Sequence, residues 1–183
     1  MTKKKFILPI FIVGLMVFSI FGVVIGSLSA DNADSFKYKD YKFNYDGRTW
    51  FTFKDKQRIE FSIDPRELDT ISIGGLIDKL NSHNKIYLSV DPDQALDTEI
   101  QYFRTLITQM FQKPVINACP KENEDCKDLP LKDCPNAIPN QDLIIKLEKG
   151  DNLLEEEGSC ITITGDRNYF IGVLEKTRLE MIL

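Results

Sequence analysis

Residues 86–116 read IYLSVDPDQALDTEIQYFRTLITQMFQKPVI, and this stretch decides the fold. Of its first five residues, four are apolar and two of those are β-branched, which predicts a strand. Apolar residues then recur at alternating spacings of four and three, which predicts a helix over about residues 92–112. That apolar stripe consists of Leu96, Ile100, Phe103, Ile107 and Met110. Because Pro114 ends the helix and residues 114–116 form a second short strand, the unit is strand–helix–strand, with a right-handed crossover expected.

The apolar stripe of this helix needs a partner surface. Packing against the sheet is the interpretation that we favour, and a groove for a partner helix is the alternative.

An echo of the same motif lies upstream, where IEFSIDP at residues 59–65 resembles IYLSVDP at residues 86–92. Each segment predicts a strand that delivers an Asp, Asp64 or Asp91, to the start of a helix. Helix capping explains both carboxylates, with Pro next and Glu67 or Gln94 completing a capping box. The functional alternative is that the two carboxylates meet at one sheet edge, for acid/base work or calcium binding.

Residues 41–63 predict an antiparallel meander rich in aromatic residues. Asp46-Gly47 between alternating aromatic runs indicates a tight hairpin, and a two-residue turn there places Phe43 opposite Trp50. Residues 59–63 alternate again and predict a third strand. The aromatic residues are expected in the core, with a carbohydrate-stacking platform as the alternative.

The remaining segments predict further helices and strands. A short helix is expected after Gly74-Gly75, ending near Ser82, and a further helix from Asp166 to about residue 175. Residues 143–147 and 160–164 predict strands, and residues 179–183 receive no assignment. The acidic run at residues 155–157 is interpreted as a solvated turn, and the only histidine, His83, as a solvated loop residue.

The N-terminal part predicts a membrane anchor. Residues 6–26 carry no charge and follow Lys3, Lys4 and Lys5. As a helix, 21 residues would span roughly 31 Å, which matches a bilayer core. The lysines favour a cytoplasmic N-terminus, so the rest of the chain is expected outside the cell. A cleaved signal peptide, cut after Ser29 or Ala30, is one alternative, and a buried soluble helix is the other.

The outer part of the chain is acidic. The whole chain has a net charge of −5. Without the three N-terminal lysines, 20 basic and 28 acidic residues remain, which gives a net charge of −8. This balance argues against nucleic acid and against anionic lipid headgroups as partners.

All four cysteines lie in the outer part, and they are Cys119, Cys126, Cys134 and Cys160. An even count outside the cytosol predicts two disulfides, and we favour Cys119–Cys126 with Cys134–Cys160. Zinc sites use closer spacings, so a metal site is the weaker alternative, beside free thiols. The segment that begins at Cys119 and ends at Pro139, which we name the cysteine loop, is the expected partner-binding region.

No catalytic, cofactor-binding or metal-binding residues stand out. Gly158-Ser159-Cys160 lacks the Gly-x-Ser-x-Gly spacing, and no phosphate-binding glycine loop or Cys-x-x-Cys motif is present. A carboxylate hydrolase leaves no sequence motif, so Asp64 and Asp91 are its candidates. A thiol–disulfide enzyme is a third hypothesis.

The layout resembles small, uncharacterised single-pass membrane proteins of archaea. The resemblance lies in residues 3–26, 41–50 and 158–165 (GSCITITG), and in YFIG at 169–172. It implies a basic tip, an apolar anchor and a cysteine-bearing outer domain, and no activity or site residue.

Together these observations predict an α+β protein. Residues 1–5 form a cytoplasmic tip, residues 6–30 an anchor (or signal peptide) and short spacer, and residues 31–183 one outer domain. This domain should contain a mixed sheet, made of the meander and the strand–helix–strand unit. It should also contain the cysteine loop, held by disulfides. The expected function is a non-enzymatic interaction or envelope-associated module, with a cell-surface hydrolase as the alternative.

Overall fold

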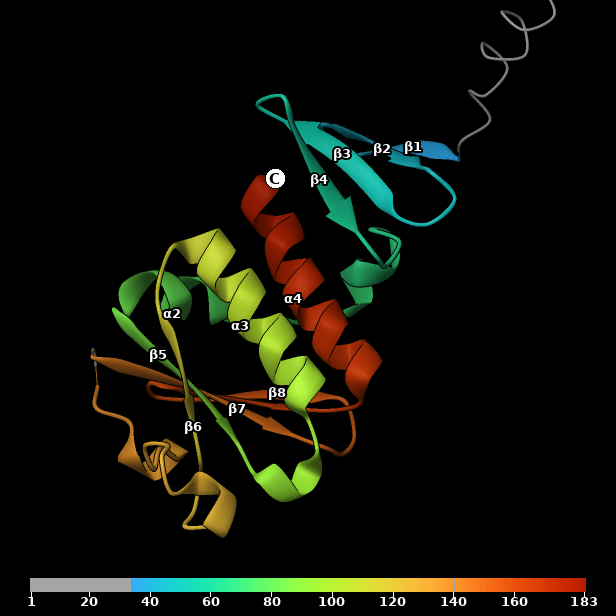
Figure 1. The fold of residues 1–183 in the computed structure, drawn as a ribbon. Helices are drawn as coiled ribbons and strands as arrows, with labels where there is room; N and C mark the ends of the chain where they lie inside the picture. Colours follow the sequence, from blue (N-terminus) through green and yellow to red (C-terminus); the bar gives the residue numbers. More distant parts are fainter. Residues whose placement is uncertain (1–33, 140) are drawn as a thin grey trace, which may run out of the picture.

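The computed structural model describes residues 34–139 and 141–183 (Figure 1). They form an α+β structure with two sheets, three α-helices and two disulfides, which confirms the predicted class. The expected single mixed sheet was wrong, because the aromatic meander forms a sheet of its own.

The N-terminal sheet is antiparallel and has the order β1-β2-β3-β4. It contains four strands, whereas the sequence predicted three. Their bounds are β1 (Ser35–Tyr38), β2 (Tyr41–Tyr45), β3 (Trp50–Lys54) and β4 (Gln57–Phe61).

The predicted register of the first hairpin was wrong by two residues. Tyr45, not Phe43, lies opposite Trp50. The cause is the side chain of Asp46, whose Oδ1 accepts hydrogen bonds from the backbone N–H groups of Arg48 and Thr49. Asp46 therefore opens the turn, and Gly47, with φ of +92°, occupies its first central position. A shift of two residues keeps every side chain on its predicted face.

The second sheet has the order β6-β5-β7-β9-β8. Only β8 is antiparallel to its neighbour. The bounds are β5 (Lys85–Val90), β6 (Val115–Ala118), β7 (Asp142–Glu148), β8 (Leu153–Glu157) and β9 (Cys160–Thr164). Residues 155–157 thus belong to an edge strand, and their interpretation as a turn was wrong. The turn follows at Gly158, where φ is +54°.

Three α-helices accompany the sheets: α2 (Leu76–Ser82), α3 (Asp97–Phe111) and α4 (Arg167–Ile182). Helix α3 starts five residues later than predicted. Asp91 does accept a hydrogen bond from the N–H of Asp93, but it caps only the short 3₁₀ helix η3 (Pro92–Gln94). The backbone of Ala95 then adopts the left-handed conformation, with φ of +48°. The Gln94 side chain accepts a hydrogen bond from the N–H of Lys149 instead of completing a capping box. The 3₁₀ helix after Asp64 is η2 (Glu67–Thr70).

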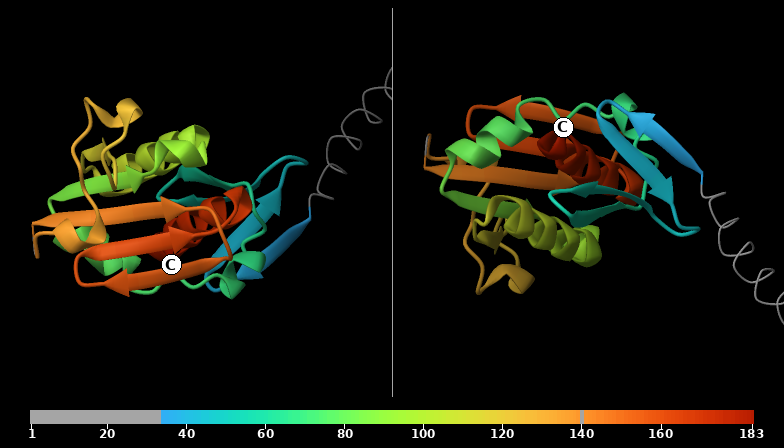
Figure 2. Two further views of the ribbon diagram at one scale, coloured as in Figure 1. Left: turned by 90° about the horizontal axis from the view of Figure 1, so that it is seen from below. Right: turned by 90° about the horizontal axis from the view of Figure 1, so that it is seen from above.

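Helix α4 lies between the two sheets in the views of Figures 1 and 2. Its first half packs into the core of the five-stranded sheet, and Leu179 and Ile182 pack with the aromatic residues of the N-terminal sheet. At its end, Nζ of Lys54 in β3 donates to the backbone oxygens of Met181 and Ile182. Residues 179–183, which had no assignment, therefore join the two sheets.

Helix α3 packs beside α4 on the same sheet. The rings of Phe103 and Phe170 meet edge to face, 6.2 Å apart. Phe103 and Ile107 are fully buried in the main core, which confirms the predicted packing of the apolar stripe.

Within residues 34–139 and 141–183, no helix is both long enough and apolar enough to cross a bilayer. The predicted anchor at residues 6–26 lies outside the described residues.

Candidate functional site

The cysteine loop connects β6 to β7, and both predicted disulfides are confirmed. Cys119, at the end of β6, pairs with Cys126 in the short helix η4 (Glu124–Cys126). Cys134, which opens η5 (Cys134–Asn136), pairs with Cys160 at the start of β9. The first bridge closes a small ring inside the loop. The second ties the loop to β9, an interior strand of the sheet.

Backbone hydrogen bonds also hold the loop against β6. The N–H of Cys119 donates to the oxygen of Pro130, and the N–H of Lys132 donates to the oxygen of Cys119. These bonds form a parallel bridge between Cys119 and Leu131. The bridge lies one residue beyond the end of β6, so the loop returns alongside the strand that it leaves.

The loop packs on the face of the sheet opposite α3 and α4. Nζ of Lys132 lies 2.7 Å from a carboxylate oxygen of Asp142 and 4.7 Å from the ring centre of Tyr87. The hydroxyl of Ser89 donates to the backbone oxygen of Lys132. Since Asp142 and Ser89 are buried, Lys132 satisfies polar groups that would otherwise be costly to enclose.

Ion pairs join the loop to the carboxyl ends of β5 and β7. Nζ of Lys121 lies 2.7 Å from Asp91, and Nζ of Lys146 lies 3.1 Å from Asp133. The hydrogen bond from Lys121 lowers the pKa of Asp91. Burial acts to lower the pKa of Lys146, but hydrogen bonds to Glu148 and Asp133 outweigh it, and the pKa is raised. These pairs surround a small cavity of about 170 Å³.

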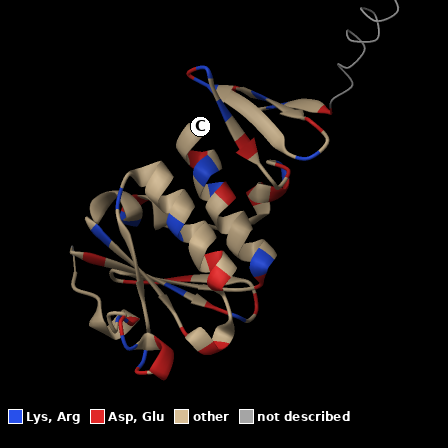
Figure 3. Cartoon of the chain, viewed as in Figure 1, with Lys and Arg blue, Asp and Glu red and all other residues tan. Residues whose placement is uncertain are grey.

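Apolar side chains are exposed on the cysteine loop. Leu129, Leu131 and Ile138 are 37%, 42% and 46% exposed, and Ile116 in β6 is 36% exposed. The other large apolar side chains exposed among the described residues are Phe53, Leu153 and Leu183. Leu129 and Leu131 line an open depression of about 570 Å³, together with charged residues such as Glu122 and Lys127. Figure 3 shows charged residues of both signs along this part of the chain. This combination of a fixed backbone and exposed apolar residues is typical of a protein-binding surface.

No protein-family model matches this chain, and no curated protein or solved structure is significantly similar to it. The function must therefore be argued from the chemistry of its own residues. Within the described part of the chain, no group of three or more His, Cys, Asp and Glu residues is placed to hold a metal ion.

Asp64 and Asp91 do not meet at a common sheet edge, so the functional alternative to helix capping, a pair of carboxylates at one edge, was wrong. Asp64 follows β4 in the N-terminal sheet and binds the guanidinium of Arg66. Asp91 follows β5 in the other sheet and binds Lys121. The two motifs are similar because each ends a strand, but the strands belong to different sheets.

His83 is buried, at 6% exposed, and its interpretation as a solvated residue was wrong. Nδ1 lies 2.8 Å from the backbone oxygen of Lys79, which can only accept, so Nδ1 carries the proton. Nε2 then accepts from the hydroxyl of Ser159 at 3.1 Å. Because Ser159 is itself buried, this pair links α2 to the turn before β9 and is not an exposed nucleophile.

A second cavity, of about 340 Å³, lies between α3, α4 and the end of β4. Its most buried polar group is the carboxylate of Glu175, which is 2% exposed. This carboxylate accepts hydrogen bonds from the backbone N–H groups of Ser62 and Ile63, from the Ser62 hydroxyl and from Tyr102. Burial, and then the charge of Glu175, raises the pKa of Tyr102 to about 12. The lone pairs of Glu175 are thus used within the protein, so it joins α4 to β4 and is not available as a base.

Proposed function

We propose that this chain is a membrane-anchored, extracytoplasmic interaction module without catalytic activity, and that its cysteine loop binds a protein partner. Residues 6–26 would hold the N-terminus in the membrane. The rest of the chain would face an oxidising compartment, in which two disulfides are expected to persist.

One observation carries the proposal. The cysteine loop exposes Leu129, Leu131 and Ile138 although two disulfides hold it in place. A loop ordered before binding loses little conformational entropy when a partner docks, and exposed apolar side chains supply the favourable term. A loop that served only as a connection between β6 and β7 would not need either feature.

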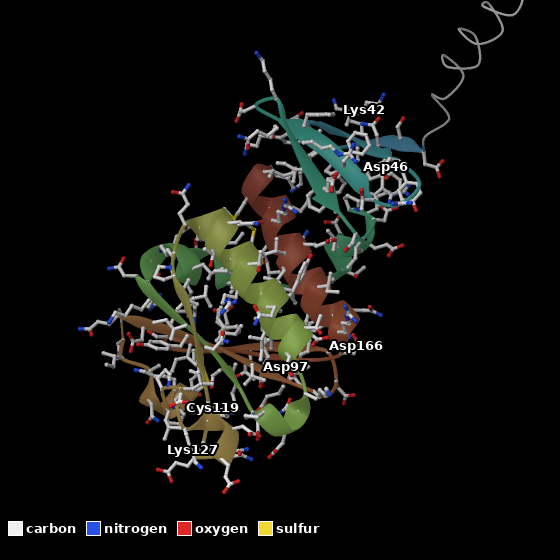
Figure 4. All side chains as sticks on the ribbon, in the orientation of Figure 1. Lys42, Asp46, Asp97, Cys119, Lys127 and Asp166 are labelled. Atoms are coloured by element: carbon white, nitrogen blue, oxygen red, sulfur yellow. A yellow bond between two sulfur atoms is a disulfide. The ribbon has the colours of Figure 1, made fainter. Side chains whose placement is uncertain are left out.

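The position of the loop in the molecule supports this proposal. The cysteine loop and β1 lie at opposite ends of the structure, as Figure 4 shows for Cys119 and Lys127 against Lys42. Only eight residues, 27–34, separate the proposed anchor from β1, and they reach at most about 29 Å. The N-terminal sheet would therefore stay near the bilayer, and the loop would face away from it.

Crosslinking of the full-length chain in membranes of its native host tests this function. A photo-crosslinking amino acid at Leu131 is expected to capture one defined protein, and L129D is expected to abolish the capture. The matched control is a crosslinker at Leu153, which is also exposed but lies on β8.

Equal capture of the same protein from both positions would contradict a role of the loop. Capture that persists in the L129D variant would do so as well. Circular dichroism of each variant checks that the fold is retained.

A further inference from the structure

The N-terminal sheet has one face that packs on α4 and one face that does not. Alternation along the strands turns Phe43, Trp50 and Phe61 toward α4. It turns Lys37, Lys42, Phe53 and Arg58 to the opposite side, which we name the outer face, and Figure 4 shows Lys42 there.

The register aligns these four outer residues in one row across the four strands. Lys37 lies opposite Lys42, and Phe53 lies opposite Arg58. Extending the pairing of Asn44 with Phe51 by two residues along each strand places Lys42 beside Phe53, which is 55% exposed. Two like charges directly opposite each other destabilise an antiparallel pair. The described residues place no carboxylate within ion-pair distance of either lysine.

The charge of this sheet is opposite to that of the remaining domain. From Ser35 to Phe61 the chain has seven basic and four acidic residues, or +3. Residues 62–183 have 13 basic and 22 acidic residues, or −9. Arg58 is engaged by Asp46 and Glu60, so the uncompensated charge of the row is that of Lys37 and Lys42. The overall acidity that argued against lipid headgroups therefore does not describe this face.

We propose that the outer face docks on anionic lipid headgroups of the membrane that holds the chain. This inference rests on the proposed anchor, because a tether of eight residues keeps the face near the bilayer. The lysines would contact phosphate groups, and the ring of Phe53 would enter the interfacial region, where aromatic side chains are favoured. Docking would hold the cysteine loop in a defined direction away from the membrane.

Fluorescence of the full-length chain in vesicles tests the docking. Trp50 is the only tryptophan, so F53W in a W50F background places a single indole on the outer face. Lipids brominated in their acyl chains should quench this indole in vesicles of phosphatidylcholine with phosphatidylglycerol. Quenching should fall in phosphatidylcholine alone, and also in about 1 M salt, where the screening length is about 3 Å.

Charge variants give the decisive comparison. Each lysine near an anionic surface changes the docked-to-undocked ratio about fivefold, so K37E/K42E should reduce this ratio by about 25-fold or more. The double variant keeps two like charges opposite each other, so its stability should match that of the parent. The control K85E/K127E changes two exposed lysines of the other sheet and the cysteine loop, and it should leave quenching unchanged.

Quenching that does not depend on lipid charge, or that falls equally in both double variants, would overturn the proposed docking. Flotation of the vesicles at high salt reports the anchor separately. A chain that does not float there would contradict the anchor, whereas charge-dependent quenching would still support docking.

Discussion

At the residue scale, the most informative side chains are polar groups that the structure buries. His83 lies in a polar turn, and Glu175 is a charged residue that follows an apolar run, so neither residue type predicts burial at its position. Their partners, Ser159 for His83 and Ser62 for Glu175, are 76 and 113 residues away. A buried polar group is costly unless it is hydrogen-bonded, so such residues hold distant segments in one arrangement.

We expect E175Q to lower the free energy of unfolding by about 1–3 kcal/mol. The amide would direct N–H donors at N–H groups that now donate to a carboxylate, and it would leave buried donors unpaired. Urea denaturation measures the change, and E67Q, at an exposed site in η2, is the control. A loss equal to that of the control would contradict the assigned role of Glu175.

Tyr102 should make stability sensitive to alkaline pH. Its pKa is raised to about 12 in the folded protein, above the ordinary value of about 10. The neutral phenol is favoured by folding, so this contribution is fully present below pH 10 and is lost as pH rises toward 12. Unfolding midpoints at pH 9 and 11 should therefore differ less in Y102F than in the parent chain. An unchanged difference would contradict this assignment.

At the element scale, local patterns predicted the type of each element better than its ends or its neighbours. The strand–helix–strand unit formed by β5, α3 and β6 is present, and the helix predicted from Asp166 is α4, which Asp166 caps but which continues to Ile182, beyond the predicted end near residue 175. The predicted start of α3 was wrong because Asp91 caps the separate 3₁₀ helix η3. The acidic strand β8 was missed because its pairing with β9, and not its own composition, makes it extended.

The outer row of the N-terminal sheet gives a prediction about element stability. K37E should raise the free energy of unfolding by about 0.2–1 kcal/mol, because an opposite charge would then face Lys42. Thermal unfolding in a neutral detergent measures the gain, which should shrink as salt is added. No gain at low salt would contradict the cross-strand contact.

At the scale of the whole molecule, helix α4 and the disulfides connect parts that are distant in the sequence. Helix α4 contributes to both cores, and the Cys134–Cys160 bridge holds the cysteine loop to β9. The N-terminal sheet and the cysteine loop consequently occupy opposite ends of one structure (Figure 1). If the anchor and the outer face both hold the protein to the membrane, this arrangement exposes the cysteine loop on the side that faces away from the membrane.

Loss of the Cys134–Cys160 bridge should destabilise the protein more than loss of the Cys119–Cys126 bridge. The two close chain segments with sequence separations of 26 and 7. Loop-closure entropy then suggests losses of about 3.5 and about 2.5 kcal/mol. Denaturant unfolding of the C134S/C160S and C119S/C126S variants measures both. The reverse order would show that enthalpy, and not chain entropy, dominates.

The sequence by itself determined the α+β class, the presence of two disulfides and the packing of α3 on a sheet, whereas it only favoured one of three possible cysteine pairings. Helical periodicity and cysteine count are local or compositional properties that physical rules translate directly. Only the tertiary structure decided that there are two sheets, that His83 and Glu175 are buried, and that basic residues gather on one face. These features depend on which distant strands pair and on which residues thereby become neighbours. The hydrophobic pattern selects the buried face of a strand, but it does not select the strand that will lie beside it.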